Sequence, residues 1–235
     1  MDPGLLPLFT EPILAGEADY TKGNRFFHVE DARAMPMLRL VGNAALSFMA
    51  KLSTGYWEIF DPTNGYTAIH ARLIPHLPLE KIAKRYFFET DMLFRLNTMQ
   101  AVVVDVPMEA VYGDERSNLR IARVLPEFAG RHLGNLAKRI FYGYFLRDFS
   151  LASIELLLAV ALLLFGLAFG SYHWWDSIQT GKAAPIGTAL LAAVPTLLGV
   201  QFGLGFLSFD MRTRPERPIH KRLARSAIKE RARRD

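Results

Sequence analysis

Two long apolar segments constrain the fold of this chain more than any other feature. Residues 149–170 read FSLASIELLLAVALLLFGLAFG, and residues 183–209 read AAPIGTALLAAVPTLLGVQFGLGFLSF. Each is about the length that a helix needs to cross ~30 Å of hydrocarbon. A pair of buried core helices is the alternative, but such helices rarely run this long without a charged face. We therefore expect a two-helix transmembrane hairpin, in which three glycines of the second span pack on the first: Gly199, Gly203 and Gly205.

The charges that flank these segments predict their orientation. Residues 211–235 carry ten Lys and Arg residues against three acidic ones. The connector 171–182 holds only Lys182 against Asp176, and it contains aromatic residues typical of a membrane interface: Tyr172, Trp174 and Trp175. Positive charge follows the cytoplasmic ends of spans, so we expect a multi-pass membrane protein with both termini cytoplasmic.

A basic tail is also compatible with nucleic-acid binding. Basic residues directly after a span are more simply a topology signal and a contact with anionic lipid, so we expect no nucleic-acid partner. The chain has no cysteine. That composition excludes disulfides, thiolate metal sites and a cysteine nucleophile.

Before the spans, the pattern indicates mixed α/β structure. A helix is predicted from Pro36 to about Lys51, and short helices over 79–84 and 90–98. A short helix is also expected through Leu5 to Ala15. Strand-like segments lie at 67–69 and 102–104, and Gly23-Asn24 has the composition of a turn.

The chain divides into four predicted parts. Residues 1–124 form the α/β part, residues 149–209 the hairpin, and residues 210–235 a basic cytoplasmic tail. Residues 125–148 combine aromatic and basic side chains with helical spacing. A segment of this kind directly before a span is expected to be an amphipathic helix in the membrane interface.

Three motifs before the spans hold the candidate chemistry. Asp61-Pro-Thr-Asn64-Gly65-Tyr66 places a carboxylate before a turn, from which its side chain can be aimed at a ligand. An Asp that hydrogen-bonds its own turn backbone is at least as good an interpretation of this motif alone. Glu89 and Asp91 follow an aromatic run; one of them is expected to face a site while the other caps the helix.

The order of these motifs resembles family-two glycosyltransferases, in particular the membrane-anchored branch of polyprenyl- and dolichyl-phosphate sugar synthases. The resemblance rests on six short stretches: Ala18-Asp19-Tyr20 with Gly23-Asn24-Arg25-Phe26, Arg39 to Asn43, Thr54-Gly55 with Asp61 to Tyr66, Phe88 to Leu93, Val103 to Pro107, and Tyr112 to Ser117. It implies a nucleotide-sugar-binding, GT-A-like mixed sheet and inverting transfer of a sugar to a lipid-linked phosphate. It also implies a divalent metal, Mg or Mn.

The resemblance further implies roles for individual residues. The catalytic candidates are Asp61, Glu89 and Asp91, and the substrate-binding candidates are Asn64, Gly65, Arg25, Arg116 and Ser117. Arg116 with Ser117 would lie in the loop that holds the acceptor phosphate, to which an arginine fork is well matched. A solvated loop charge beside Asp114 and Glu115 is the alternative for Arg116. Because threonine follows Glu89 where relatives carry Glu-Asp, Asp61 becomes the preferred base.

This chain also departs from the family pattern. No Asp-x-Asp pair occurs in it, and its six histidines show no ligand spacing that replaces one. We therefore expect the C-terminal part of a transferase, with the donor-binding half and its metal motif missing, either as a truncated gene product or as a short protein.

Two rival functions stay open. One is a non-catalytic membrane subunit that partners a full-length transferase, and a weaker one is a transporter component. The sugar, the nucleotide and any homo-oligomeric state are not determined by the sequence.

Overall fold

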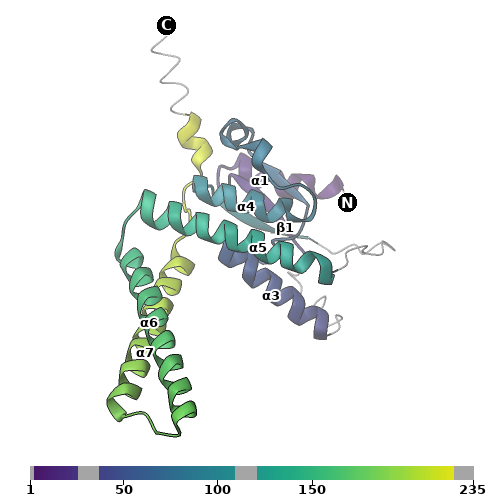
Figure 1. Cartoon of the computed structure of the whole chain (residues 1–235). Coiled ribbons are helices and arrows are strands. Elements are labelled where there is room, and N and C mark those ends of the chain that lie inside the picture. Colours follow the sequence, from purple (N-terminus) through teal and green to yellow (C-terminus); the bar gives the residue numbers. More distant parts are fainter. Residues whose placement is uncertain (1–2, 26–36, 109–120, 225–235) are drawn as a thin grey trace. The chain divides into compact units, whose positions relative to one another are not determined.

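The computed structural model describes residues 3–25, 37–108 and 121–224. It divides into two compact units, one formed by residues 1–140 together with 214–235, and one by residues 141–213. Figure 1 labels their helices and strands. The chain thus leaves the first unit, forms the second, and returns to the first. The four-part division expected above stays a prediction.

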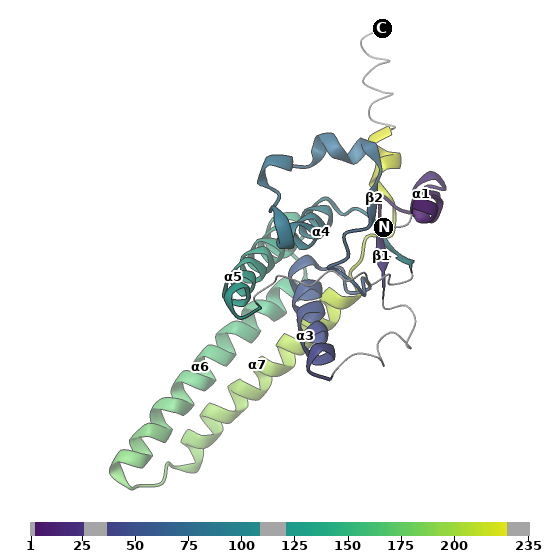
Figure 2. The same cartoon turned by 90° about the vertical axis from the view of Figure 1, so that its right-hand side faces the viewer.

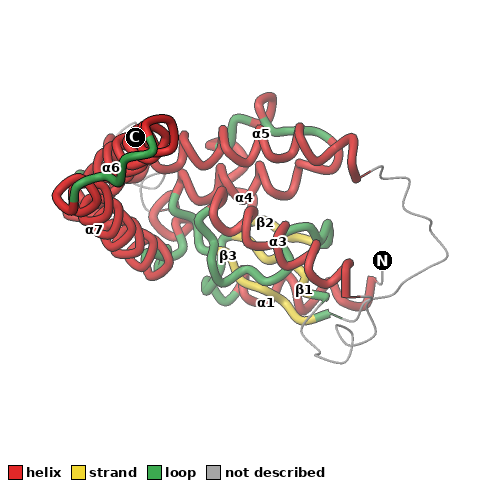
Figure 3. The backbone as a smooth tube through the Cα atoms, turned by 60° about the horizontal axis from the view of Figure 1, so that its bottom comes forward, coloured by secondary structure: helices red, strands yellow, loops and turns green. Residues whose placement is uncertain are grey.

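A small mixed sheet lies at the centre of the first unit (Figure 3). Among the described residues it has three strands in the order β2-β1-β3, with β1 spanning Tyr20–Asn24, β2 Thr67–Ile69 and β3 Val103–Pro107. Strand β1 pairs antiparallel with β2 and parallel with β3. The mixed sheet is therefore confirmed, whereas its membership in a GT-A-like fold stays a prediction.

The predicted turn at Gly23-Asn24 is wrong. Both residues lie inside β1, where they pair with Val106 and Pro107 of β3, and the turn follows at Arg25. A Cβ atom on Gly23 would lie 2.5 Å from Met108 Sδ and 2.7 Å from Asn64 Nδ2. Glycine thus allows side chains to approach the strand closely and does not serve a turn here.

Helices cover both sides of this sheet. The helical elements of the first unit are η1 (Pro3–Leu5), α1 (Leu6–Leu14), α3 (Met37–Thr54), η2 (Ala71–His76), η3 (Leu79–Lys81), η4 (Arg85–Phe87), α4 (Phe88–Met99) and α5 (Ile121–Ile140). Helix α1 lies on one side of the sheet and α4 with α5 on the other (Figure 2). The helices predicted at 5–15, from Pro36 and at 90–98 are confirmed by α1, α3 and α4.

The hydrophobic core of this unit forms between the sheet and α4. Leu93 and Leu96 of α4 are fully buried in it, and Tyr20 of β1 is 2% exposed. Tyr56, just after α3, is buried in the same cluster and donates its hydroxyl hydrogen bond to Ala101 O at 2.6 Å. The buried tyrosine hydroxyl is thereby satisfied, as a polar group in a core must be.

The segment that follows the second apolar helix belongs to this core. Ile219 is one of its buried residues. Asp19, which is fully buried, accepts hydrogen bonds from the backbone N–H groups of Ile219 (2.8 Å), His220 (2.9 Å) and Val102 (2.9 Å). Its Oδ1 also lies 2.7 Å from His220 Nδ1. One carboxylate therefore joins the entrance to β1, the residue before β3 and the returning tail.

Over residues 127–140, where its side chains are described, helix α5 buries three polar side chains. Residues 132, 135 and 139 lie on one face and are His132, Asn135 and Arg139, each under 9% exposed. Asn135 Nδ2 donates to Asp91 Oδ1 at 3.3 Å, and Arg139 Nη2 donates to Leu52 O at 2.8 Å. One face of α5 is thus bound to α3 and α4, so only its other face, with Leu133 64% exposed, is available to a membrane interface.

The second unit is a helical hairpin. It begins with the π-helical turn η5 (Phe141–Arg147), followed by α6 (Leu151–Thr180) and α7 (Ile186–Arg212). Both long helices are apolar and long enough to cross a membrane, α6 with 30 residues and α7 with 27. Helix α6 continues to Thr180, so most of the connector expected at 171–182 is helical, and five residues join the two helices. The aromatic residues of this segment are therefore exposed on the last turns of α6: Tyr172, Trp174 and Trp175.

Small residues bring the two long helices together. A Cβ atom on Gly199 would lie 2.9 Å from Leu163 N, and one on Gly166 would lie 2.9 Å from Thr196 N. Backbone atoms cannot move aside cheaply, so only glycine fits at these positions. Near the start of α6, Tyr144 donates its hydroxyl hydrogen bond to buried Asp210 Oδ1 at 2.7 Å.

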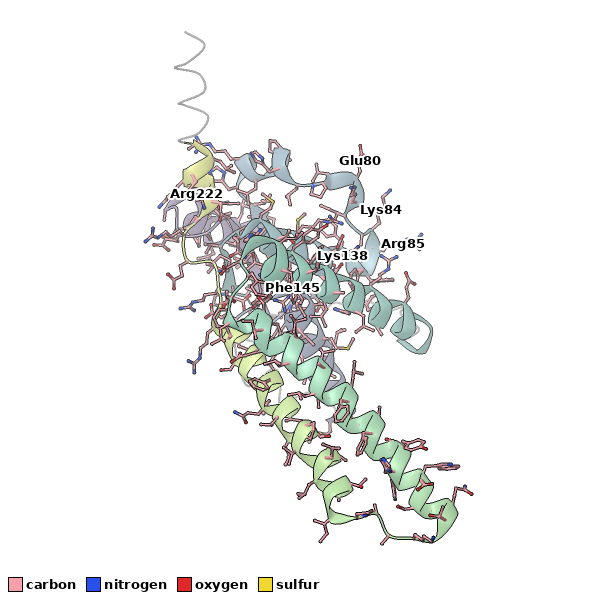
Figure 4. The ribbon with its side chains drawn as sticks, turned by 60° about the vertical axis from the view of Figure 1, so that its left-hand side comes forward. Glu80, Lys84, Arg85, Lys138, Phe145 and Arg222 are labelled. Carbon is pink, nitrogen blue, oxygen red and sulfur yellow. The ribbon has the colours of Figure 1, made fainter. Side chains whose placement is uncertain are left out.

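We expect Asp19→Asn to lower the free energy of unfolding of the first unit by about 3 kcal/mol. An amide has one acceptor oxygen, and its NH2 group would face N–H donors of the strand and tail. Chemical denaturation measures the loss, and trypsin should then cleave faster after Lys221 and Arg222. Glu80→Gln, at an exposed side chain that points outward (Figure 4), is the control. Equal denaturation midpoints for both variants would contradict the role of Asp19.

The free energy of unfolding of the first unit should decrease in mild acid, because buried His132 becomes protonated more readily in the unfolded state. Its Nδ1 lies 2.7 Å from Ser53 Oγ, and burial lowers the pKa of His132 from 6.5 to about 4. The folded state therefore binds fewer protons than the unfolded state, and the stability present above pH 6.5 is lost as pH falls toward 4. Denaturation midpoints at several pH values should show a flatter profile for His132→Gln in this window. The exposed His76→Gln should keep the wild-type profile, and an equal flattening there would refute the assignment.

Candidate functional site

The candidate residues gather where the parallel strands β1 and β3 end. Lys22 pairs in register with Asp105, so their side chains lie next to each other on one face of the sheet. Asn24, on the same face, donates to Asp105 Oδ2 at 3.3 Å. In open sheets with parallel strands, ligands bind beside the carboxyl ends of the strands. This end of the sheet is therefore the natural place to examine the predicted site.

The Asp61–Tyr66 loop is fixed against β1. Asn64 Oδ1 accepts from Tyr66 N at 2.9 Å, which closes the turn. Gly23 N donates to Tyr66 O at 2.9 Å, and Lys22 Nζ donates to Asn64 O at 2.5 Å. Asn64 therefore shapes the loop, and Gly65 is exposed at its tip.

Asp61 and Arg25, both predicted as site residues, form an ion pair. Arg25 Nε donates to Asp61 Oδ2 at 2.7 Å and Arg25 Nη2 to Asp61 Oδ1 at 3.1 Å. Thr63 Oγ1 also donates to Asp61 Oδ1, at 3.0 Å. The Asp61 side chain is 1% exposed and that of Arg25 32%. Both oxygens of Asp61 are thus engaged, in the two-point geometry that arginine and carboxylate prefer.

Lys22 is a functional candidate that the sequence analysis missed. Its side chain is fully buried, and burial lowers its pKa from 10.5 to about 8, against the opposing effect of Glu89, Asp61 and Asp105. Its positive charge partly offsets the negative charge of these three carboxylates. The signal available in the sequence was a lysine inside a strand-like segment, Tyr20 to Asn24.

Asp105 is the second residue that was missed as a site candidate. Burial raises its pKa from 3.8 to about 6, although the Phe60 N–H donates to Oδ2 at 2.8 Å. Its other oxygen, Oδ1, is buried and has no hydrogen-bond partner among the described residues. The sequence signal was an acidic residue within an apolar strand, Val103-Val104-Asp105-Val106. A carboxyl that titrates near neutrality beside a loop and a lysine marks a candidate site.

Glu89 and Asp91 occupy different environments. Glu89, half-buried in the first turn of α4, lies close enough to the loop that a Cβ atom on Gly65 would be 3.5 Å from its Oε1. Asp91 is buried elsewhere: its Oδ2 accepts from Ala83 N at 2.8 Å and from Arg95 Nε at 3.3 Å. The structure therefore brings Glu89 to the Asp61 loop and places Asp91 in contacts that tie α4 to the preceding segment.

The remaining predicted site features are Arg116, Ser117 and a divalent metal. Arg116 and Ser117 fall outside the described residues. Among the described residues, no group of three His, Asp or Glu side chains could hold a metal ion. The acidic residues of the site do not fit one, since Asp61 is paired with Arg25 and Asp105 lies beside Lys22. A divalent metal stays a prediction, and no step is assigned to it.

Comparison with known proteins gives one informative similarity. A scan against protein-family models finds no match. The chain is 28% identical over 102 residues to the UDP-N-acetylglucosamine–dolichyl-phosphate N-acetylglucosaminyltransferase of Methanococcus voltae. The matched region is 43% of this chain and spans 40% of the length of that relative. The name of this relative describes a glycosyltransferase and includes dolichyl phosphate, a lipid phosphate. This agrees with the resemblance to polyprenyl- and dolichyl-phosphate sugar synthases that the motifs indicated.

The close packing at Gly23 gives a test of the site's geometry. Gly23→Ala would put a methyl group against Met108, Asn64 and Phe9, so we expect a loss of about 2 kcal/mol of stability. The melting temperature should fall by several degrees in a thermal denaturation experiment. Gly65→Ala, whose Cβ meets only Glu89 at an ordinary distance, should leave it unchanged. A Gly23→Ala protein as stable as the Gly65→Ala protein would show that the loop is not packed as described.

Proposed function

We propose that this chain is the catalytic and membrane-anchoring part of a glycosyltransferase that transfers a sugar from a nucleotide-sugar to a lipid-linked phosphate. The observation that carries the proposal is its similarity to a UDP-N-acetylglucosamine–dolichyl-phosphate transferase. Two helices apolar enough to cross a membrane support an acceptor that resides in a bilayer. The family-two assignment and a GT-A-like fold belong to the same proposal.

In this function the acceptor approaches the Asp61–Tyr66 loop. The loop backbone is fixed to β1, and Arg25 with Lys22 provides positive charge at its base. Cations favour a phosphate monoester over a neutral alcohol as the acceptor. Asp61 positions the Arg25 guanidinium, since both of its oxygens are used in that contact. Arg116 and Ser117 would add contacts to the same phosphate.

The proposed step is a displacement at the anomeric carbon of the sugar. An acceptor phosphate oxygen forms a new bond to that carbon, and the bond from the carbon to the donor diphosphate breaks, releasing a nucleoside diphosphate. A phosphate monoester has its second pKa near 6, so part of the acceptor carries a proton at neutral pH. We assign Glu89 as the base that accepts it, because Glu89 is half-buried beside Gly65 and has no hydrogen-bonded partner among the described residues.

Membrane placement follows from the same reasoning. If α6 and α7 both cross the bilayer, the two ends of the hairpin lie on one side, together with the first unit that both ends enter. The basic residues of the tail favour the cytoplasmic side for that unit, where nucleotide-sugars are available to it. Both termini would then be cytoplasmic.

A transfer assay tests the function directly. The full chain in lipid nanodiscs is incubated with radiolabelled UDP-N-acetylglucosamine and dolichyl phosphate, and the organic phase is analysed for a sugar-linked lipid. Label in the lipid fraction supports the proposal. Transfer that appears only after a second polypeptide is added, with no binding of the nucleotide-sugar by this chain, would instead indicate a non-catalytic partner subunit.

Glu89→Gln should lower kcat about twofold or more at pH 6, where about half of the acceptor phosphate still carries its proton, because the amide cannot accept that proton. The KM for the donor should change little, since Glu89 is assigned to the acceptor side. Initial rates over a range of donor and acceptor concentrations measure both quantities. Glu80→Gln, an exposed carboxylate before the same helix, should match the wild type. A near-normal kcat for Glu89→Gln would remove Glu89 from the mechanism.

A further inference from the structure

Exposed aromatic rings gather next to the Asp61 loop. We use the name Phe60 surface for Phe48, Lys51, Trp57, Phe60 and Arg214. Phe48 is 51% exposed and Phe60 53%. The Phe48 and Trp57 rings meet edge to face with centroids 5.8 Å apart, and Lys51 Nζ lies 5.6 Å from the Phe60 ring centre. Two aromatic pairings, one with a lysine, therefore lie on α3 and the segment that follows it in the first unit.

The backbone that presents Phe60 is firmly held. Its N–H donates to Asp105 Oδ2 at 2.8 Å, and its C=O accepts from Ser47 Oγ at 3.2 Å. The preceding residue, Ile59, is 2% exposed and belongs to the core. About half of Phe60 is thus exposed on a fixed loop, and covering the exposed apolar area of Phe60 together with that of Phe48 would be favourable.

Chain continuity limits what can cover this surface. Arg214 forms an ion pair with Glu58, two residues before Phe60. Arg214 is also only two residues beyond Arg212, the end of apolar helix α7, a span of at most about 7 Å. The chain that leaves a layer around the end of α7 therefore reaches the Arg214–Glu58 pair within two residues. Aromatic rings flanked by Lys and Arg are the side chains that proteins place at the headgroup level of a bilayer.

We infer that the Phe60 surface docks into the interface of the lipid bilayer, with Phe48 and Phe60 inserted among the headgroups and Lys51 beside lipid phosphates. This inference rests on the proposal that α6 and α7 cross the membrane. Because Phe60 directly precedes Asp61, docking holds the Asp61–Tyr66 loop at the depth of a lipid-linked phosphate. The acceptor then reaches the loop without leaving the membrane.

Because the chain has no cysteine, a spin label attached to a single introduced cysteine reports the membrane depth of that position alone. Single cysteines are introduced at Phe60, at Phe48 and, as a matched control, at Leu79, which is 54% exposed in the same unit. Each full-length protein is spin-labelled and placed in nanodiscs of phosphatidylcholine with phosphatidylglycerol. Collisions with oxygen, which partitions into lipid, are compared with collisions with a water-soluble nickel chelate.

We expect labels at positions 60 and 48 to favour oxygen over nickel at least threefold relative to the label at 79. Thermal unfolding of each variant confirms that it is folded. Labels at 60 and 79 with equal ratios would overturn the inference. So would shielding of position 60 that persists in detergent and grows with protein concentration, because it would point to a second copy of the chain.

The outcome is separable from that of the transfer assay. A membrane-docked but inactive protein would refute the proposed function and leave the docking intact. An active protein whose label at 60 stays in water would refute the docking alone.

Discussion

The buried carboxylate of Asp19 is the interaction on which the first unit depends. It accepts hydrogen bonds from the backbone of Val102 and from Ile219 and His220, which are separated from it by some two hundred residues of sequence. A buried charge is tolerated only when its oxygens are fully paired, so these segments must be in place together. The direction of β1, its parallel pairing with β3 and the return of the chain from α7 are all coupled through this group.

That coupling determines which side chains lie together at the C-terminal end of β1. With β1 and β3 aligned in parallel, Lys22 and Asp105 lie side by side, and the Asp61–Tyr66 loop is hydrogen-bonded across them. Burial moves the pKa of the lysine down and that of the aspartate up, toward neutrality in both cases. The result is a compact group of opposite charges next to Glu89, suited in the proposed function to an anionic acceptor and the proton it carries.

The proposed membrane docking extends this arrangement outward. The Phe60 N–H donates to Asp105, so the same residue fixes the exposed aromatic ring and belongs to the charged group of the site. In the proposed function, the bilayer, the Asp61 loop and the strand ends are then linked through neighbouring residues of one loop. A lipid substrate would meet the site by lateral diffusion rather than by extraction into water, where its apolar chain is costly.

The sequence by itself determined the elements whose signals are local. Apolar length predicted the two long helices, helical spacing predicted α3 and α4, and the apolar run at 102–104 predicted β3. The order of short motifs also pointed to a sugar transferase, in agreement with the relative from Methanococcus voltae. Tertiary structure alone decided that Gly23 lies in a strand, that Arg25 and Asp61 pair, and that the tail returns to Asp19. These outcomes depend on contacts between residues far apart in the chain, where burial and pairing override the local preferences that a sequence pattern expresses.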